Sequence, residues 1–162
     1  MRVALVHDYL NQYGGAERVL EALHELYPHA PVYTSIYDPG ALPALYRTWD
    51  IRVSWMQRLP GWRRLFRAYF PLYPSAFESF DLSEYDLVLS SSSAYAKGAI
   101  PAPGARHICY CHTPMRFAWR TGDYLEREGV GRLQRAVLPI ALSYVRPVSY
   151  THLRAHETDS YL

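Results

Sequence analysis

The first twenty-three residues constrain the fold of this chain more than any other segment. The apolar run at residues 3–6 predicts a buried strand, and Gly14-Gly15 follows it after a short polar stretch. Within residues 19–26 apolar side chains recur every three to four positions, which predicts a helix with one buried face. A strand, a glycine turn and a helix in this order are typical of the first unit of an open α/β sheet. The backbone N–H groups at the start of that helix would favour an anion.

Four further short segments predict strands, at residues 31–36, 51–55, 86–89 and 106–111. Short apolar strands of this kind are typical of a parallel sheet that helices cover on both faces. We therefore predict an α/β fold with a Rossmann-like parallel sheet.

Two helices are expected outside the first unit. Residues 62–70 predict a helix that Pro71 and Pro74 interrupt. Residues 130–145 predict a second helix, kinked at Pro139.

Composition narrows the class of protein. A length of 162 residues allows one domain, and a formal charge of +2 is too small to indicate a nucleic-acid partner. No segment approaches the roughly 20 apolar residues of a membrane span, and the first apolar run is too short for a signal peptide. The two cysteines, Cys109 and Cys111, are too close along one strand for a useful disulfide, so we expect a reducing, cytoplasmic compartment.

Two candidate features lie at predicted strand ends. Gly14-Gly15 would let the backbone approach a ligand, although a simple turn is the alternative and the spacing of a dinucleotide or phosphate-binding loop is absent. His112 follows a strand, where it could exchange a hydrogen bond with a substrate hydroxyl or merely cap its loop. Successive strand positions point to opposite faces, so Cys109, Cys111 and His112 cannot easily converge on one ion, and we expect no metal.

Two other features are a serine loop and a basic segment. Residues 90–97 hold four serines, a tyrosine and a lysine after a predicted strand end, where such sheets place ligand loops, although an ordinary polar turn is the alternative. In the helix expected at residues 62–70, Arg63, Arg64 and Arg67 share one face and bulky apolar side chains another. This pattern is typical of a helix on an anionic membrane surface, and also of one that packs on its own sheet.

The end of the chain departs from the α/β pattern. Residues 148–158 read VSYTHLRAHET and resemble a translated transposase-type sequencing adapter. We therefore expect residues 1–146 to form the domain and residues 147–162 to be a non-native tail. On that reading His152 and His156 form no metal site, although their spacing would suit one on a helix.

Three segments together resemble the N-terminal domain of family-four glycosyltransferases with the GT-B fold. They are VALVHDYLNQYGGAERVLEAL at residues 3–23, DLVLSSSSAYAKG at 86–98 and CYCHTPMRFAW at 109–119. The resemblance implies transfer of a sugar from a nucleoside-diphosphate-sugar to a glycan or lipid-linked acceptor, with retention of configuration, as in polysaccharide biosynthesis. The family's C-terminal donor-binding domain has no counterpart here. We therefore expect an inactive fragment that is cytoplasmic or peripheral at the membrane.

The resemblance also implies site residues. His112 would touch the transferred sugar, and Gly14 and Gly15 would approach the donor diphosphate. The nucleotide-sugar is a substrate, so no cofactor is implied. Arg120 departs from the acidic residue expected after the tryptophan. Further candidates to line the cleft or the acceptor site are Asp8, Arg18, Ser91, Ser92, Lys97 and Arg116.

Two other readings remain open on the sequence. One is a stand-alone flavodoxin-like domain whose glycine and serine loops hold a small anion. The other is a membrane-associating scaffold that uses its basic helix.

Overall fold

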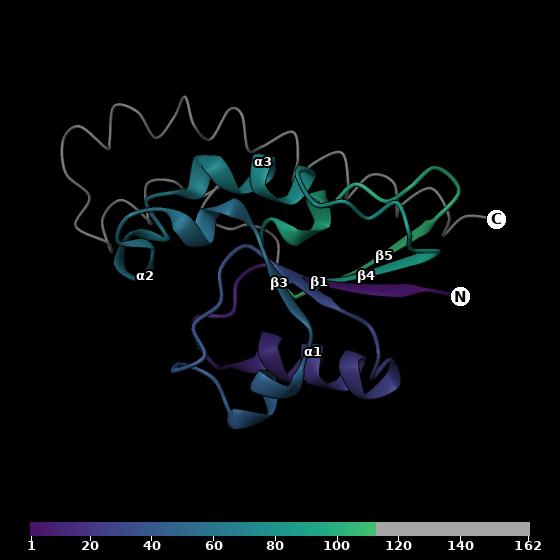
Figure 1. The fold of residues 1–162 in the computed structure, drawn as a ribbon, viewed down its shortest axis with the longest axis horizontal. Coiled ribbons are helices and arrows are strands. Elements are labelled where there is room, and N and C mark those ends of the chain that lie inside the picture. The colour runs from purple at the N-terminus through teal and green to yellow at the C-terminus, as the bar shows by residue number, and fades with distance from the viewer. Residues whose placement is uncertain (113–162) are drawn as a thin grey trace.

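The computed structural model describes residues 1–112, which form a single five-stranded parallel sheet (Figure 1). The predicted α/β, Rossmann-like fold is thereby confirmed. Arg116, the helix expected at residues 130–145 and the expected tail lie outside the described residues. The strands, in sheet order, are β3 (Ile51–Val53), β2 (Val32–Thr34), β1 (Val3–His7), β4 (Leu87–Ser92) and β5 (Arg106–Cys111).

The strand order identifies one crevice. From β1 the chain moves outward to β2 and β3, then returns to place β4 and β5 on the other side of β1. This order, 3-2-1-4-5, is that of Rossmann sheets, whereas flavodoxin-like sheets have the order 2-1-3-4-5. The direction of travel reverses between β1 and β4. In open α/β sheets the ligand crevice lies at the carboxyl ends of the strands at such a reversal.

Both faces of the sheet are covered, and β1 shows why. Its side chains alternate, so that Ala4 and Val6 pack in one apolar cluster while Val3 and Leu5 pack in the other. Figure 1 shows α1 on one side of the sheet and α2 and α3 on the other. The helices are α1 (Gly15–Leu26), α2 (Trp62–Leu65) and α3 (Tyr73–Glu78), with short 3-10 turns η1 (Ala44–Thr48), η2 (Trp55–Arg58), η3 (Phe70–Leu72) and η4 (Ala96–Gly98).

The helix predicted at residues 62–70 is wrong in extent. Helix α2 ends at Leu65, and a separate helix, α3, begins at Tyr73. Pro74 lies in the first turn of α3, where a proline loses no hydrogen bond and its fixed φ suits the helix. Pro74 therefore helps to begin a helix, whereas the sequence analysis predicted that it would interrupt one.

The serine run is also placed differently from the prediction. Strand β4 continues to Ser92, and Ser90, Ser91 and Ser92 pair with residues 109–111 of β5. All three serines are buried. Their hydroxyl groups have side-chain hydrogen-bond partners, which lets polar residues lie inside the sheet.

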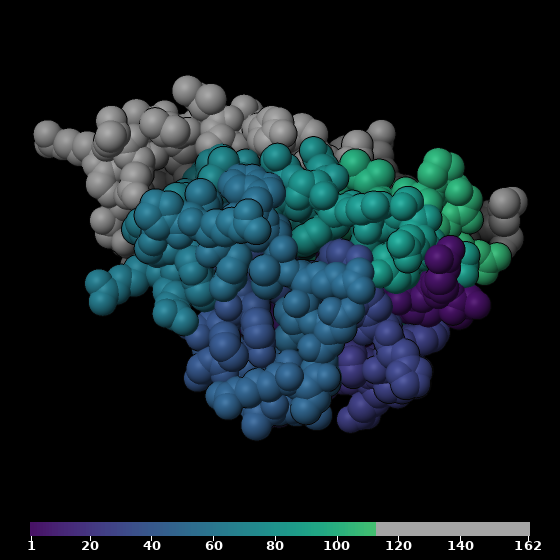
Figure 2. All heavy atoms as spheres, in the orientation of Figure 1, coloured from purple at the N-terminus to yellow at the C-terminus, as the bar shows by residue number. Residues whose placement is uncertain are grey.

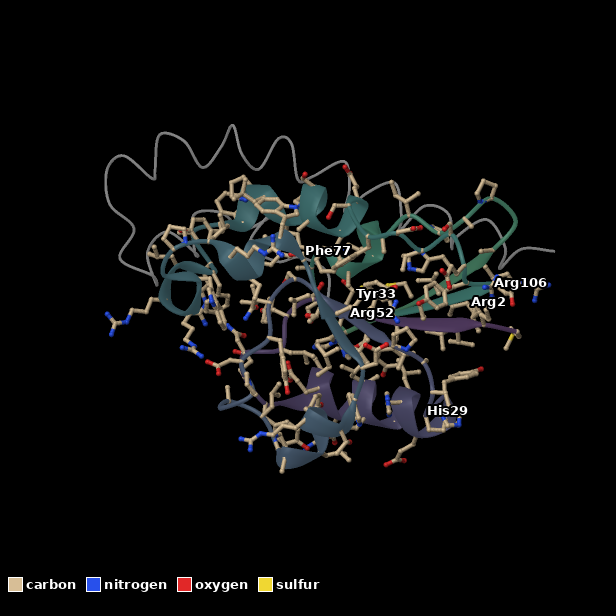
Figure 3. The ribbon with its side chains drawn as sticks, in the orientation of Figure 1. Arg2, His29, Tyr33, Arg52, Phe77 and Arg106 are labelled. Carbon is tan, nitrogen blue, oxygen red and sulfur yellow. The ribbon has the colours of Figure 1, made fainter. Side chains whose placement is uncertain are left out.

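The edge strand β3 is tied to the sheet by a polar cluster. Arg52 donates to the hydroxyls of Tyr33, at 2.8 Å, and of Tyr85, at 3.2 Å. Figure 3 shows the side chains of Arg52 and Tyr33 next to each other. Burial, and then the hydrogen bond with Tyr33, raises the pKa of Tyr85 to about 12. The cluster therefore stays protonated and intact at neutral pH.

The chain begins at the amino ends of the strands, opposite the crevice at their carboxyl ends. Figure 2 shows the first residues, in purple, exposed at one end of the molecule, and the backbone N–H of Arg2 donates to Asp86, just before β4, at 2.7 Å. In the part of the chain that the structure describes, no helix is long and apolar enough to cross a membrane.

Candidate functional site

Four side chains from four separate parts of the chain form a hydrogen-bonded row in the crevice, which we call the histidine chain. It consists of Glu17 in the first turn of α1, His7 at the end of β1, Ser91 in β4 and His112 just after β5. His7 and Ser91 face each other in the sheet register. The Ser91 hydroxyl lies 3.2 Å from His7 Nδ1 and 2.7 Å from His112 Nε2, and His7 Nε2 lies 3.5 Å from Glu17 Oε1.

The histidine chain is buried at one end and opens at the other. His7 and Glu17 are each 2% exposed, whereas His112 is half-buried. Burial lowers the pKa of His112, and the charge of His7 lowers it further, against smaller opposing effects of Asp8 and Glu17. The row therefore ends in an imidazole that is neutral at pH 7.

Glu17 carries the negative charge of the histidine chain. Burial alone would raise the pKa of the Glu17 carboxyl. The hydrogen bond and charge of His7, together with backbone N–H groups at the start of α1, outweigh that effect, and the pKa lies below its usual value. The carboxylate sits in the first turn of α1, where the helix dipole favours a negative charge. The start of this helix was predicted to favour an anion, and the Glu17 carboxylate already supplies part of that negative charge.

The two glycines before α1 serve different purposes. Gly14 has an extended backbone that any residue adopts, but a Cβ there would lie 3.3 Å from Glu17 Oε2. A Cβ on Gly15 would meet nothing within 4 Å. Gly14 therefore makes room for the Glu17 carboxylate, and Gly15 leaves an open surface at the helix start.

Asp8 organises the loop that follows β4, an arrangement we call the Asp8 cradle. Its carboxylate is 4% exposed and accepts five hydrogen bonds. The sequence reading placed Asp8 and Ser92 as cleft-lining groups; in the structure they bond to each other beneath the loop. The donors are the Ser92 hydroxyl and the backbone N–H groups of Ser93, Ala94, Tyr95 and Ala96, at 2.6 to 3.1 Å.

Of the other predicted site residues that the structure describes, only some belong to the histidine chain. Ser91 belongs to the histidine chain, and Lys97 is buried in η4, where its charge acts on the Cys109 thiol. Arg18 is exposed, with its guanidinium 5.8 Å from the ring centre of Tyr13. Within residues 1–112 no described contact joins Arg18 to the histidine chain.

The basic segment shows the expected two sides, but α2 ends at Leu65, so Arg67 lies beyond the helix. Arg63, Arg64 and Arg67 are exposed, and Arg63 pairs with Asp38 at 3.0 Å. Trp62 and Phe66 pack against the apolar cluster above the sheet. These two apolar side chains are therefore used for internal packing, whereas Leu65 is 47% exposed.

The sequence reading missed His7 and gave Glu17 no role of its own. A histidine and an aspartate that directly follow an apolar strand were the available signal, because ionisable groups are seldom buried without partners. Ser90 forms a similar pair with His107, with 2.9 Å between Ser90 Oγ and His107 Nε2. Adjacent strand positions point to opposite faces, so this pair lies on the other side of the sheet from Ser91.

No other cluster in the described part of the chain competes with this crevice. A cavity of about 390 Å³ lies at the opposite edge, lined in part by Arg2, Tyr27 and His29, and it contains no member of the histidine chain. Residues 1–112 hold no group of three or more His, Cys, Asp or Glu side chains that could bind a metal ion. No family model, curated protein or solved structure matches the chain.

Proposed function

We propose that this chain is the acceptor-side part of a retaining glycosyltransferase of the GT-B type, acting with a donor-binding domain. His112 would contact the transferred sugar, and Gly14 and Gly15 would face the diphosphate of the nucleoside-diphosphate-sugar. One observation carries the proposal. Ser91 Oγ lies 2.7 Å from His112 Nε2 and 3.5 Å from the carbonyl oxygen of Ala16, so His112 lies near the start of α1. Two motifs about a hundred residues apart thus meet at one crevice.

The charge state of the site suits this reaction. The bond between the anomeric carbon and the diphosphate breaks as the acceptor hydroxyl oxygen forms a bond on the same face, and the hydroxyl proton leaves with the diphosphate. Positive charge builds on the sugar ring in the transition state. A neutral His112 can hydrogen-bond a sugar hydroxyl without adding repulsion, which fits the effect of burial on its pKa.

The helix start suits the leaving group. Negative charge grows on the diphosphate as the bond breaks, and the N-terminus of a twelve-residue helix such as α1 favours it. Glu17 is buried in the same turn, where its Oε1 lies 3.5 Å from His7 Nε2. The open space above Gly15 leaves the backbone accessible to a phosphate oxygen.

The proposal can be tested by NMR on the full chain labelled with ¹⁵N. We expect UDP-sugars and GDP-sugars, at millimolar concentration, to shift the amide signal of Gly15 and the side-chain signals of His112. Inorganic pyrophosphate should shift Gly15 alone. His112→Ala should weaken the Gly15 shift caused by nucleotide-sugars and keep the shift caused by pyrophosphate, whereas the control His107→Ala should keep both.

Two results would count against the proposal. Binding of FMN at the crevice with no response to any nucleotide-sugar or oligosaccharide would favour a stand-alone anion-binding domain. Sugar transfer or nucleotide-sugar hydrolysis that persists after His112→Ala would contradict the role given to this residue.

A further inference from the structure

The directions of the hydrogen bonds in the histidine chain are coupled, because the Ser91 hydroxyl has only one proton to donate. An ionised Glu17 accepts a proton from His7 Nε2. When His7 is neutral, its Nδ1 is an acceptor, so Ser91 donates to it. The Ser91 oxygen then accepts from His112 Nε2–H, and His112 Nδ1 keeps a lone pair.

A second proton on His7 reverses every bond beyond it. His7 Nδ1 then donates to Ser91, and Ser91 donates to His112 Nε2. The proton of the His112 ring must now sit on Nδ1. The charge state of His7 thus decides whether the outer nitrogen of His112 accepts or donates a hydrogen bond.

We propose that His7, Ser91 and Glu17 are positioning residues that set the tautomer of His112 and store the proton that reaches it. A proton arrives at His112 Nδ1, and the Nε2 proton of the same ring passes to Ser91 Oγ. The original Ser91 proton passes to His7 Nδ1. One proton enters, His112 stays neutral, and the positive charge lies on His7 beside the Glu17 carboxylate.

The surroundings favour this place for the charge. Glu17 Oε1 lies 3.5 Å from His7 Nε2, whereas His112 has no carboxylate within hydrogen-bonding distance among the described residues. Asp8 is the other nearby carboxylate, and its oxygens already accept five hydrogen bonds. Tyr46 donates to the backbone carbonyl of Glu17, away from the carboxylate.

Competition for the Ser91 hydroxyl is weak. The carbonyl oxygen of Ala16 lies 3.5 Å from Ser91 Oγ, farther than either histidine nitrogen. Burial also lowers the pKa of His112, which disfavours a charge at the outer end of the row.

This inference deepens the proposed function, because it gives His112 a defined hydrogen-bonding role toward a sugar hydroxyl. Its test needs no sugar, so the two proposals can fail separately. The test records the side-chain ¹⁵N signals of the full chain, with His7→Phe and His112→Ala used for assignment. On acidification we expect His7 to become the imidazolium and His112 to change from the Nε2–H to the Nδ1–H tautomer.

Variants distinguish the relay from a merely structural role. Ser91→Ala should abolish the tautomer change of His112, and Ser91→Thr should restore it. The matched control Ser90→Ala should alter His107 and leave His112 unchanged. Glu17→Gln removes the negative charge that stabilises the His7 imidazolium, so the change should then require a lower pH. It serves as the second test if Ser91→Ala does not fold.

Two outcomes would overturn the proposal. One is that His112 becomes the imidazolium before His7 does. The other is that the tautomer change survives in folded Ser91→Ala, or keeps its wild-type pH midpoint in folded Glu17→Gln.

Discussion

Replacing Asp8 by asparagine changes one atom of a buried side chain and leaves its shape intact. Asp8 Oδ2 accepts the backbone N–H groups of Ser93 and Ala94, and Oδ1 accepts those of Tyr95 and Ala96. In either orientation, the amide NH₂ of asparagine must face one of these pairs of donors. Two hydrogen bonds to a charged acceptor are therefore lost, and two buried N–H groups are left without partners.

The expected cost follows from these two bonds. Hydrogen bonds to charged groups contribute about 1.5–3 kcal/mol each, so Asp8→Asn should lower the free energy of unfolding by about 3–6 kcal/mol. Asp8 is 4% exposed, so water can replace the lost partners only if the loop opens. A domain has a total stability of about 5–15 kcal/mol, so this one change removes a large share of it.

Urea unfolding followed by circular dichroism measures the effect. With a slope of about 2 kcal/mol per M, the midpoint should fall by on the order of 2 M. Asp81→Asn is the matched control, because Asp81 accepts from the N–H and hydroxyl of Ser83 in an exposed turn, and its midpoint should barely move. An Asp8→Asn midpoint close to that of the wild type would refute the view that the carboxylate holds the loop.

Three other changes test separate parts of the structure. Gly15→Ala places a Cβ in open space, so the free energy of unfolding, measured by thermal unfolding, should stay level or rise by about 0.4–1 kcal/mol. The same variant should lose the NMR response to pyrophosphate. A retained response would show that no ligand approaches this glycine. The membrane contact expected from the sequence is tested by replacing Arg63, Arg64 and Arg67 together by glutamate: the wild type should float with vesicles that contain anionic lipid and the variant should not, and equal behaviour of the two would rule out this face as the contact. The phenol of Tyr85 has a pKa of about 12 in the folded state, above the unfolded value of about 10, so its contribution to stability is present below pH 10 and is lost as the pH rises toward 12. Tyr85→Phe should therefore show a shallower loss of urea midpoint over that range, and an equal loss would contradict the raised pKa.

The strands were predictable where local pattern and burial agree. The segment at residues 106–111 was predicted with the bounds that β5 has, and the first strand and helix were found from apolar spacing alone. The serines at residues 90–92 were read as a loop because their hydroxyls suit turns. Their partners, His107, His112 and Asp8, come from other parts of the chain, and no local pattern reveals them.

The candidate site was only partly predictable for a similar reason. Gly14, Gly15 and His112 were selected by their positions at strand ends, which the fold preserves. The role of Asp8 depends on four backbone N–H groups that point toward its carboxylate. The residue types in a sequence do not show in which direction a backbone N–H group points. His7 was missed because its meaning depends on Glu17 and Ser91, which tertiary structure brings to it.

The Asp8 cradle also affects the order in which the chain folds as it is synthesised. It joins residue 8 to donors 84 to 88 positions later in the chain. Contacts over such a separation form late, because the entropy of closing the loop must be overcome first. On the ribosome, the Asp8 carboxylate stays in water until Ala96 has emerged. A nascent chain that stops short of that residue has β1 without the loop that closes its end, so the crevice cannot form before Ala96 has been made.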